Sequence, residues 1–234
     1  MVIPLHDDVP LRHIRRPVAT YALIVVNVAV WLLTEGVRSA ETMQAAAIGF
    51  GVIPSVLFGV DHVAPELLSV PAPATLVTSL FLHAGFFHIA GNMLFLWVFG
   101  DNVEDAMGSL RFLAFYLVCG VCAALAHAYA LPGSQQPLIG ASGAVAGIVA
   151  AYVMLHPRVR LWALFLARIP LKLRAIYVIG FWILFQIGMA FYGGPSEVGW
   201  WAHVGGFLAG VVLTPILIQP GVRLFGREDG PDPA

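Results

Sequence analysis

Charged side chains are scarce in this sequence. Only 11% of its 234 residues are Asp, Glu, Lys or Arg, whereas a soluble domain carries about a quarter. At the same time 59% of the residues are hydrophobic, and the mean hydropathy is +0.86. This balance excludes an ordinary soluble domain and predicts a polytopic membrane protein. The net charge of −1 and the lack of a basic, aromatic-interleaved stripe also indicate that no nucleic acid is a partner.

Cysteine is equally scarce, and common catalytic motifs are missing. Cys119 and Cys122 lie within one apolar run, too few and too close for a secreted disulfide framework. Small buried residues explain this pair better than a redox or metal role. The sequence has no H-E-x-x-H pair, so zinc hydrolysis is unsupported. The stretch around Ser142 is not the G-x-S-x-G elbow of soluble hydrolases, because position 144 is Ala.

A cleavable signal peptide is not predicted either. The first apolar run, from about Pro17 to Thr34, follows three arginines but is long for the apolar part of a signal peptide. No small-x-small cleavage site follows it, since Ala40 would need Arg38 at the −3 position. We interpret the run as a retained membrane span.

Six apolar segments are candidates for membrane spans. They cover residues 18–34, 84–100, 110–130, 141–155, 174–192 and 201–218. A span needs about 20 residues, so the fourth segment, which ends at His156-Pro157, is short. If its C-terminal end sits at the cytoplasmic surface, its N-terminal end stops inside the membrane. We therefore expect an all-α polytopic membrane protein with a bundle of six transmembrane helices.

Lysine and arginine are distributed unevenly over the connecting segments. In the six-span arrangement eleven of them fall on one side and only Arg38 falls on the other. Because basic residues mark the cytoplasmic side, both termini are expected there, and the loops 35–83, 131–140 and 193–200 outside. Segment 45–59 is apolar but broken by Gly and Pro, which favours an interfacial or half-inserted element. Segment 156–173 mixes arginine with apolar residues, which suits the cytoplasmic surface.

Several polar side chains fall where lipid is expected, and such groups usually mark functional sites. His88 and Asn92 are four positions apart and share a helix face. Ser142 opens the fourth segment and His203 opens the sixth. Because the second, fourth and sixth spans run in the same direction, these four groups are expected at a similar depth. Other polar groups in or near the spans are His83, His127 and Gln186.

This combination has the chemistry of acyl transfer. His203 would remove the proton of the Ser142 hydroxyl as a general base, then donate it to the leaving amine. His88, Asn92 and the Ser142 backbone N–H could bind the oxyanion of the tetrahedral intermediate. The sequence offers no obvious Asp or Glu to orient His203. We therefore predict a Ser–His dyad in which packing orients the imidazole.

Small residues accompany both reacting groups. Gly143 and Gly147 follow Ser142, and Gly206 and Gly210 follow His203. This spacing lets two helix backbones approach closely, which could join Ser142 to His203 although they are 61 positions apart. The pattern is common in any helix pair, a lone Ser at a helix start is usually a cap, and His88 with Asn92 could be a simple interhelical hydrogen-bonding pair. None of these features alone establishes catalysis.

Taken together, the ordered motifs resemble those of the rhomboid family of intramembrane serine proteases. The motifs are HAGFFHIAGN (83–92), GDNVEDAMG (100–108), GASG (140–143) and AHVGG (202–206), and the resemblance covers about residues 18–218. It implies a six-span rhomboid-like bundle that cleaves transmembrane protein substrates in or near their spans, without a metal or cofactor. It assigns Ser142 as the nucleophile, His203 as the base, and His88 and Asn92 as oxyanion donors. Supporting roles fall to His83, Gly140, Gly143 and Gly206.

Two departures from the family pattern stand out. Many relatives carry Trp-Arg in the first loop, where this sequence has Ala74-Thr75, so the anchoring of that loop is open. Many also carry an aromatic residue four positions after the nucleophile, where this sequence has Ala146. His203 must then be held by another group, and we expect Trp200 or Trp201.

The domain organisation follows from the spans. We expect a cytoplasmic N-terminal segment at 1–17, a protease domain at 18–218, and a disordered cytoplasmic tail at 219–234. The short N-terminal segment suggests a bacterial inner membrane protein, with its active site opening toward the outer side.

Two other functions are weighed against the protease. An inactive relative that binds or chaperones membrane proteins would typically lack the Ser or the His, and both are present. A small transporter or channel would need a polar relay across the bilayer, whereas the polar groups stop at one depth. The sequence does not indicate the physiological substrate, the cleavage-site preference or the oligomeric state.

Overall fold

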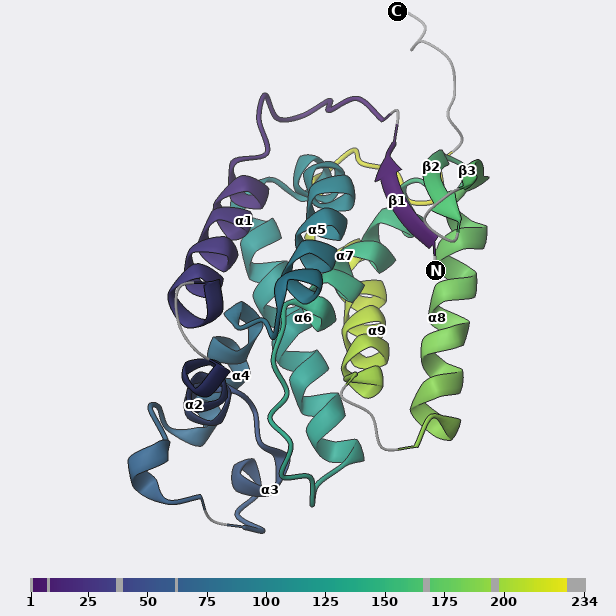
Figure 1. Ribbon diagram of the computed structural model, residues 1–234. Coiled ribbons are helices and arrows are strands. Elements are labelled where there is room, and N and C mark those ends of the chain that lie inside the picture. The colour runs from purple at the N-terminus through teal and green to yellow at the C-terminus, as the bar shows by residue number, and fades with distance from the viewer. Residues whose placement is uncertain are drawn as a thin grey trace, which may run out of the picture.

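Apolar helices form a bundle in this computed structural model, which describes residues 2–7, 9–36, 40–61, 63–165, 169–194 and 198–226 (Figure 1). A helix occupies each of the six predicted segments, which confirms a mostly helical membrane fold. These helices are α1 (Val18–Trp31), α5 (Phe86–Met107), α6 (Ser109–Ala130), α7 (Ser142–Leu155), α8 (Ala175–Tyr192) and α9 (Trp200–Leu217). Residues 227–234, half of the tail expected to be disordered, lie outside the described residues.

The lengths of these helices differ from the regular spans that the sequence predicts. Within the described residues, α6, α8 and α9 are each long and apolar enough to cross a membrane. A fourth candidate is the pair formed by residues 72–81 and α5, which is bent by 81° at the break between them. The helices at α1 and α7 are apolar but shorter. The chain is thus an integral membrane protein, and the six-span count stays a prediction.

Helix α7 lies at the centre of the bundle. It packs against α5, α6, α8 and α9, and 12 of its 14 residues are buried. A helix that is apolar all round and covered by other helices does not need to span the lipid. Its closest neighbour is α9, because a Cβ on Gly206 would overlap the carbonyl group of Gly143. A Cβ on Gly210 would likewise overlap the carbonyl group of Gly147.

The loop elements on the side opposite the N-terminus form the second part of the fold (Figure 1). They are α2 (Ala40–Phe50), α3 (Pro54–Leu57) and α4 (Ala72–Thr78), with 3₁₀ turns at Pro65–Leu67 and Ser79–Phe81; a π-helical turn at Leu32–Gly36 follows α1. The predicted interruption of segment 45–59 is confirmed, because α2 ends at Phe50 and α3 starts at Pro54.

Backbone hydrogen bonds anchor this first loop to the 131–140 loop. Val52 and Leu138 exchange both backbone hydrogen bonds, at 3.0 and 2.8 Å, and the Ser55 N–H donates to the Ser134 carbonyl at 3.0 Å. The Thr78 hydroxyl also donates to the Phe50 carbonyl at 2.7 Å. The loop is therefore attached without a Trp-Arg pair at positions 74 and 75.

A small antiparallel sheet, which the sequence did not indicate, lies at the other end of the bundle (Figure 1). Strand β1 (Val2–His6) pairs with β2 (Arg160–Phe165), which pairs with β3 (Ile169–Arg174). The segment expected to lie on the cytoplasmic surface thus folds as a hairpin that leads directly into α8. The N-terminal segment supplies one of the two edge strands, β1.

Two buried carboxylates of α5 attach the N-terminal region to the bundle. Glu104 accepts the backbone N–H groups of Ala19 and Thr20 at 3.0 and 2.8 Å, at the start of α1. It also accepts the hydroxyl groups of Thr20 and Ser109. Asp105 accepts the N–H groups of residues 12 to 14. Glu104 therefore has a structural role, because it binds backbone N–H groups at the start of α1.

Candidate active site

Ser142 and His203 lie side by side at the N-terminal ends of two packed helices. Ser142 is the first residue of α7, and His203 lies in the first turn of α9. The His203 Nε2 atom is 2.9 Å from the Ser142 Oγ atom. This approach is possible because Gly206, one turn after His203, contacts the Gly143 backbone directly. A hydroxyl and an imidazole at this distance can exchange a proton.

The other nitrogen of the imidazole has a partner that the sequence did not reveal. His203 Nδ1 is 2.8 Å from the Oε1 atom of Gln186, which is 5% exposed. In the sequence, Gln186 stands out only as a single polar residue within an otherwise apolar segment. Apolar periodicity could not show that it points toward α9.

Aromatic rings flank the same imidazole. The Trp182 ring centroid lies 6.0 Å from that of His203, and the Trp200 ring lies edge-on at 6.2 Å. Trp200 was one of the two residues expected to pack against His203. The other, Trp201, instead packs on Phe191 of α8 at 4.9 Å.

His88 lies in the first turn of α5, facing the loop that precedes Ser142. Its Nδ1 atom accepts the Ala84 N–H at 3.2 Å, so in the neutral ring Nε2 carries the proton and is a donor. A Cβ on Gly140 would lie only 2.7 Å from this Nε2 atom. Gly140 also has φ +116°, a conformation that favours glycine. The residue therefore leaves space for the imidazole two positions before Ser142.

Asn92 and His83 complete the group of predicted site residues. Asn92 is buried and donates one amide N–H to the His88 carbonyl at 2.9 Å, which leaves its second N–H as a further donor. His83 is fully buried, its Nε2 atom lies 3.4 Å from the Ala141 N–H, and its ring lies edge-on to that of His88 at 5.1 Å. The backbone N–H of Ser142 is in the first turn of α7, where N–H groups lack intrahelical partners.

The remaining candidate residues lie nearby in packing positions. A Cβ on Gly147 would lie 2.6 Å from the Cys119 sulfur, so this cysteine fills space between helices. His127 is buried at the end of α6. Within the described residues no three His, Cys, Asp or Glu side chains are grouped as metal ligands.

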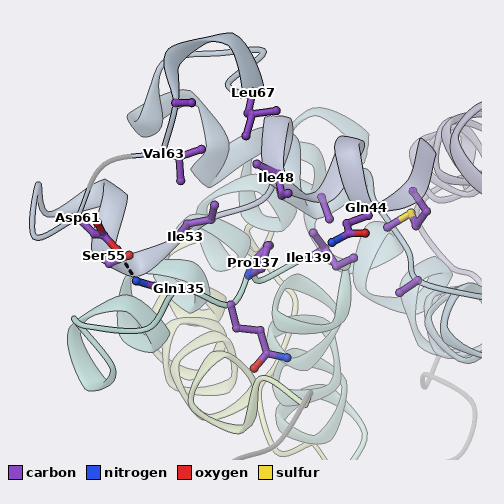
Figure 2. Close-up of a pocket in the computed structure, with 15 residues that line it drawn as sticks. Gln44, Ile48, Ile53, Ser55, Asp61, Val63, Leu67, Gln135, Pro137 and Ile139 are labelled. Atoms are coloured by element: carbon purple, nitrogen blue, oxygen red, sulfur yellow. Dashed lines mark hydrogen bonds between the residues drawn. The ribbon is translucent and has the colours of Figure 1, made fainter. Parts of the chain in front are cut away.

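A cavity of about 850 Å³ lies near the candidate site, and Figure 2 shows residues that line it. It lies between the first loop and the 131–140 loop, and Gln44, Ile53, Asp61 and Gln135 are among the residues that line it. Asp61 and Gln135 are hydrogen-bonded across it. Ala84 and Ile139 also line the cavity, and they are next in sequence to His83 and Gly140. The cavity therefore reaches the edge of the site from the end that carries α2 and α3.

Comparison with known proteins identifies the family. A Rhomboid domain model matches residues 72–220. "Rhomboid protease GluP" of Bacillus subtilis is 29% identical over 215 residues, which cover 91% of this chain and 37% of that protein. "RHOMBOID-like protein 1" of Arabidopsis thaliana is 31% identical over 157 residues, covering 67% and 38%. "Rhomboid protein 1, mitochondrial" of Saccharomyces cerevisiae is 26% identical over 201 residues, covering 82% and 51%. The chain spans about half the length of these relatives or less, and it belongs to the rhomboid family.

Proposed function

We propose that this protein is an intramembrane serine endopeptidase that cleaves transmembrane protein segments. The observation that carries the proposal is the 2.9 Å contact between His203 Nε2 and Ser142 Oγ. An isolated Ser hydroxyl is a weak nucleophile, and an adjacent imidazole that accepts its proton activates it. The two side chains come from helices that are packed backbone to backbone, so their separation is held by the bundle.

The reaction has two halves. In the first, Ser142 Oγ attacks the scissile carbonyl carbon while its proton passes to His203 Nε2. The C–N bond then breaks as His203 returns that proton to the leaving amine, which leaves an ester on Ser142. In the second half, a water gives a proton to His203 and attacks the ester carbonyl carbon. The bond between this carbon and Ser142 Oγ then breaks as His203 returns the proton to Oγ, which releases the acid product and restores the Ser142 hydroxyl.

The oxyanion of each tetrahedral intermediate needs fixed hydrogen-bond donors. We assign this role to His88 Nε2–H, the free amide N–H of Asn92 and the Ser142 backbone N–H. The acceptor role of His88 Nδ1 supports the assignment, because it leaves the proton on the nitrogen next to Gly140. His83 supports the Ala141 backbone, and Gly140, Gly143 and Gly206 provide the close approaches.

A substrate helix would reach the site from the lipid. Apolar side chains cover the outward faces of α5 and α8, with Phe87, Phe181 and Leu184 each more than two thirds exposed. The cavity beside Ile139 gives room for the unwound part of the substrate at the end of the bundle that carries α2 and α3.

We place the catalytic domain at 18–218 in a bacterial inner membrane, with both termini cytoplasmic and the site opening outward. The uneven distribution of basic residues supports this orientation. We assign the segments 1–17 and 219–234 to the cytoplasmic side on the same ground.

Cleavage of a single-span substrate by the purified protein in liposomes tests the proposal. The wild type should cut the substrate, and Ser142→Ala and His203→Ala should not, while their melting temperatures stay close to that of the wild type. Cutting by Ser142→Ala would overturn the mechanism. Binding of the substrate without cutting by the wild type would favour an inactive, membrane-protein-binding relative.

A further inference from the structure

Gln186 of α8 contacts the face of His203 that points away from the nucleophile. We propose that Gln186 is a positioning residue, which fixes the orientation and tautomer of the catalytic base; this inference rests on the proposed function. The distances are 2.8 Å from Gln186 Oε1 to His203 Nδ1 and 2.9 Å from His203 Nε2 to Ser142 Oγ. Three side chains from α8, α9 and α7 thus form one continuous chain of hydrogen bonds.

Gln186 lies on the buried face of α8. The buried residues of this helix are Ala175, Ile179 and Gln186, spaced by four and seven positions and therefore on one face. Ala175 and Ile179 belong to the apolar core. Gln186 lies on the same face but nearer to the site, and it is the one polar residue of these three.

Two aromatic pairs hold α8 in register with α9 around this position. Phe185 packs edge-on against Trp200 at 6.0 Å, and Phe191 packs against Trp201 at 4.9 Å. These contacts involve α8 residues on either side of Gln186 and the α9 residues three and two positions before His203. The amide is therefore fixed at the level of the imidazole.

The chemistry of the amide explains its effect on the base. A Gln side-chain oxygen only accepts hydrogen bonds, so its contact with Nδ1 requires the Nδ1–H tautomer. That tautomer leaves the lone pair on Nε2, the nitrogen that faces Ser142. An imidazole with the proton on Nε2 would have no lone pair facing Ser142, so it could not accept the hydroxyl proton at that nitrogen. Gln186 thus holds the ring in the tautomer that the reaction needs.

Apart from Ser142, helix α7 offers no side chain that could orient His203. The residue one turn after Ser142 is Ala146, which is buried and carries no ring or polar group. A hydrogen bond from α8, flanked by the rings of Trp182 and Trp200, supplies the orientation that α7 does not.

Kinetics of two variants at this position test the proposal. Gln186→Met keeps the length of the side chain but lacks the acceptor, whereas Gln186→Glu keeps an oxygen acceptor of the same reach. We expect kcat for Gln186→Met to fall about 10- to 100-fold with little change in KM, because the loss affects the base and not substrate binding. Gln186→Glu should keep most of the wild-type kcat. Leu110→Met, at an exposed position of α6, is the control and should keep the wild-type rate.

A spectroscopic measurement separates positioning from general stability. In protein labelled with ¹⁵N-histidine, the His203 signals are identified by their absence in His203→Ala. We expect the Nδ1–H tautomer in the wild type and in Gln186→Glu, and a mixture of tautomers in Gln186→Met. An Nε2–H tautomer in the wild type would overturn the proposal, even if Gln186→Met failed to fold. So would wild-type kcat in Gln186→Met.

The two proposals fail in different ways. If the wild type does not cleave substrate but Gln186→Met loses the Nδ1–H tautomer, the proposed function is wrong and the positioning role stands. If the wild type cleaves and Ser142→Ala does not, but Gln186→Met is fully active, only the positioning role is wrong.

Discussion

At the scale of single residues, the polar groups of the site are held by partners from several elements. His203 is held by Gln186 of α8, and His88 accepts a hydrogen bond from the backbone just before α5. Asn92 is held by the His88 carbonyl, one turn away on the same helix. Because each donor or acceptor is held by a partner within the protein, the proposed reaction would need little reorganisation of the site.

Removal of either side-chain donor of the oxyanion site should slow the reaction without abolishing it. We expect His88→Ala and Asn92→Ala to lose about 10²- to 10³-fold in kcat, the usual effect of removing one such donor. Cleavage rates at saturating substrate measure this. Gly91→Ala is a suitable control on α5, since a Cβ there meets no atom within 4 Å. Unchanged rates in both His88→Ala and Asn92→Ala would show that the oxyanion assignment is wrong.

Glu104 should matter for stability and not for the chemistry. Glu104→Ala would leave the buried N–H groups of Ala19 and Thr20 without their acceptor, and each such loss costs about 1–3 kcal/mol. We expect a clearly lower melting temperature in detergent, with the activity of the folded fraction retained. Glu66→Ala, which removes an exposed carboxylate, serves as the control. Equal melting temperatures for the two variants would contradict this role for Glu104.

The residues of the site were predictable to different degrees. Ser142, His203, His88 and Asn92 could be named because reactive groups in an apolar segment are costly and their spacing places them at one depth. Gln186 was noticed as a polar residue, but its role depends on which face of α8 meets α9. That face is set by packing of large apolar side chains, which are spread all round the helix.

At the scale of elements, the contact between α7 and α9 determines the geometry of the site. The glycines at 143 and 147 lie against those at 206 and 210, so the two backbones touch. Close backbone packing of small residues is one of the ways in which helices associate in lipid. The distance between Ser142 and His203 is therefore a consequence of this interface.

A methyl group in this interface should separate the two helices. We expect Gly206→Ala to cost about 1–3 kcal/mol of stability, as overpacking usually does, because its Cβ would overlap the Gly143 backbone. Its cleavage rate should fall by more than the loss of folded protein explains, because the methyl group increases the Ser142–His203 distance. Gly180→Ala on α8, where a Cβ meets no atom within 4 Å, should be neutral in both measurements. Full activity of Gly206→Ala would argue against the interface as the source of the geometry.

The elements themselves were partly predictable. The six apolar runs correspond to six helices because length and hydropathy are local properties of the chain. The end of α5 was not predicted, since the helix continues to Met107 through acidic residues that have buried partners. The sheet was missed because its strands are short and its first strand lies more than 150 positions from the other two.

At the scale of the whole molecule, the N-terminal segment connects distant parts of the bundle. Strand β1 joins the hairpin that leads into α8, the helix that carries Gln186. Just after β1, the buried carboxylate of Asp7 accepts hydrogen bonds from Asn102 of α5 and Tyr152 of α7. Residues 2–7 thus contact α5, α7 and the hairpin that leads into α8.

The stability of this connection should depend on pH. Burial raises the pKa of Asp7, although hydrogen bonds from Tyr152 and the Val9 backbone oppose the shift. A raised folded-state pKa means that its stabilising contribution is present below the unfolded pKa, near 4, and is lost as pH rises through the folded value. Asp7→Asn keeps an oxygen acceptor and cannot ionise. Its melting temperature relative to the wild type should therefore increase from about pH 4 to about pH 7. A difference that stays constant over this range would contradict the prediction.

The central claim is that His203 activates Ser142 as the nucleophile. Labelling with a fluorophosphonate probe, followed by peptide mass spectrometry, tests this most directly because it reads the reactive atom itself. We predict that the wild type carries the label on Ser142, and that His203→Ala, although folded, reacts far more slowly at this position. A label on any other residue, or labelling of Ser142 at the wild-type rate in His203→Ala, would contradict the account.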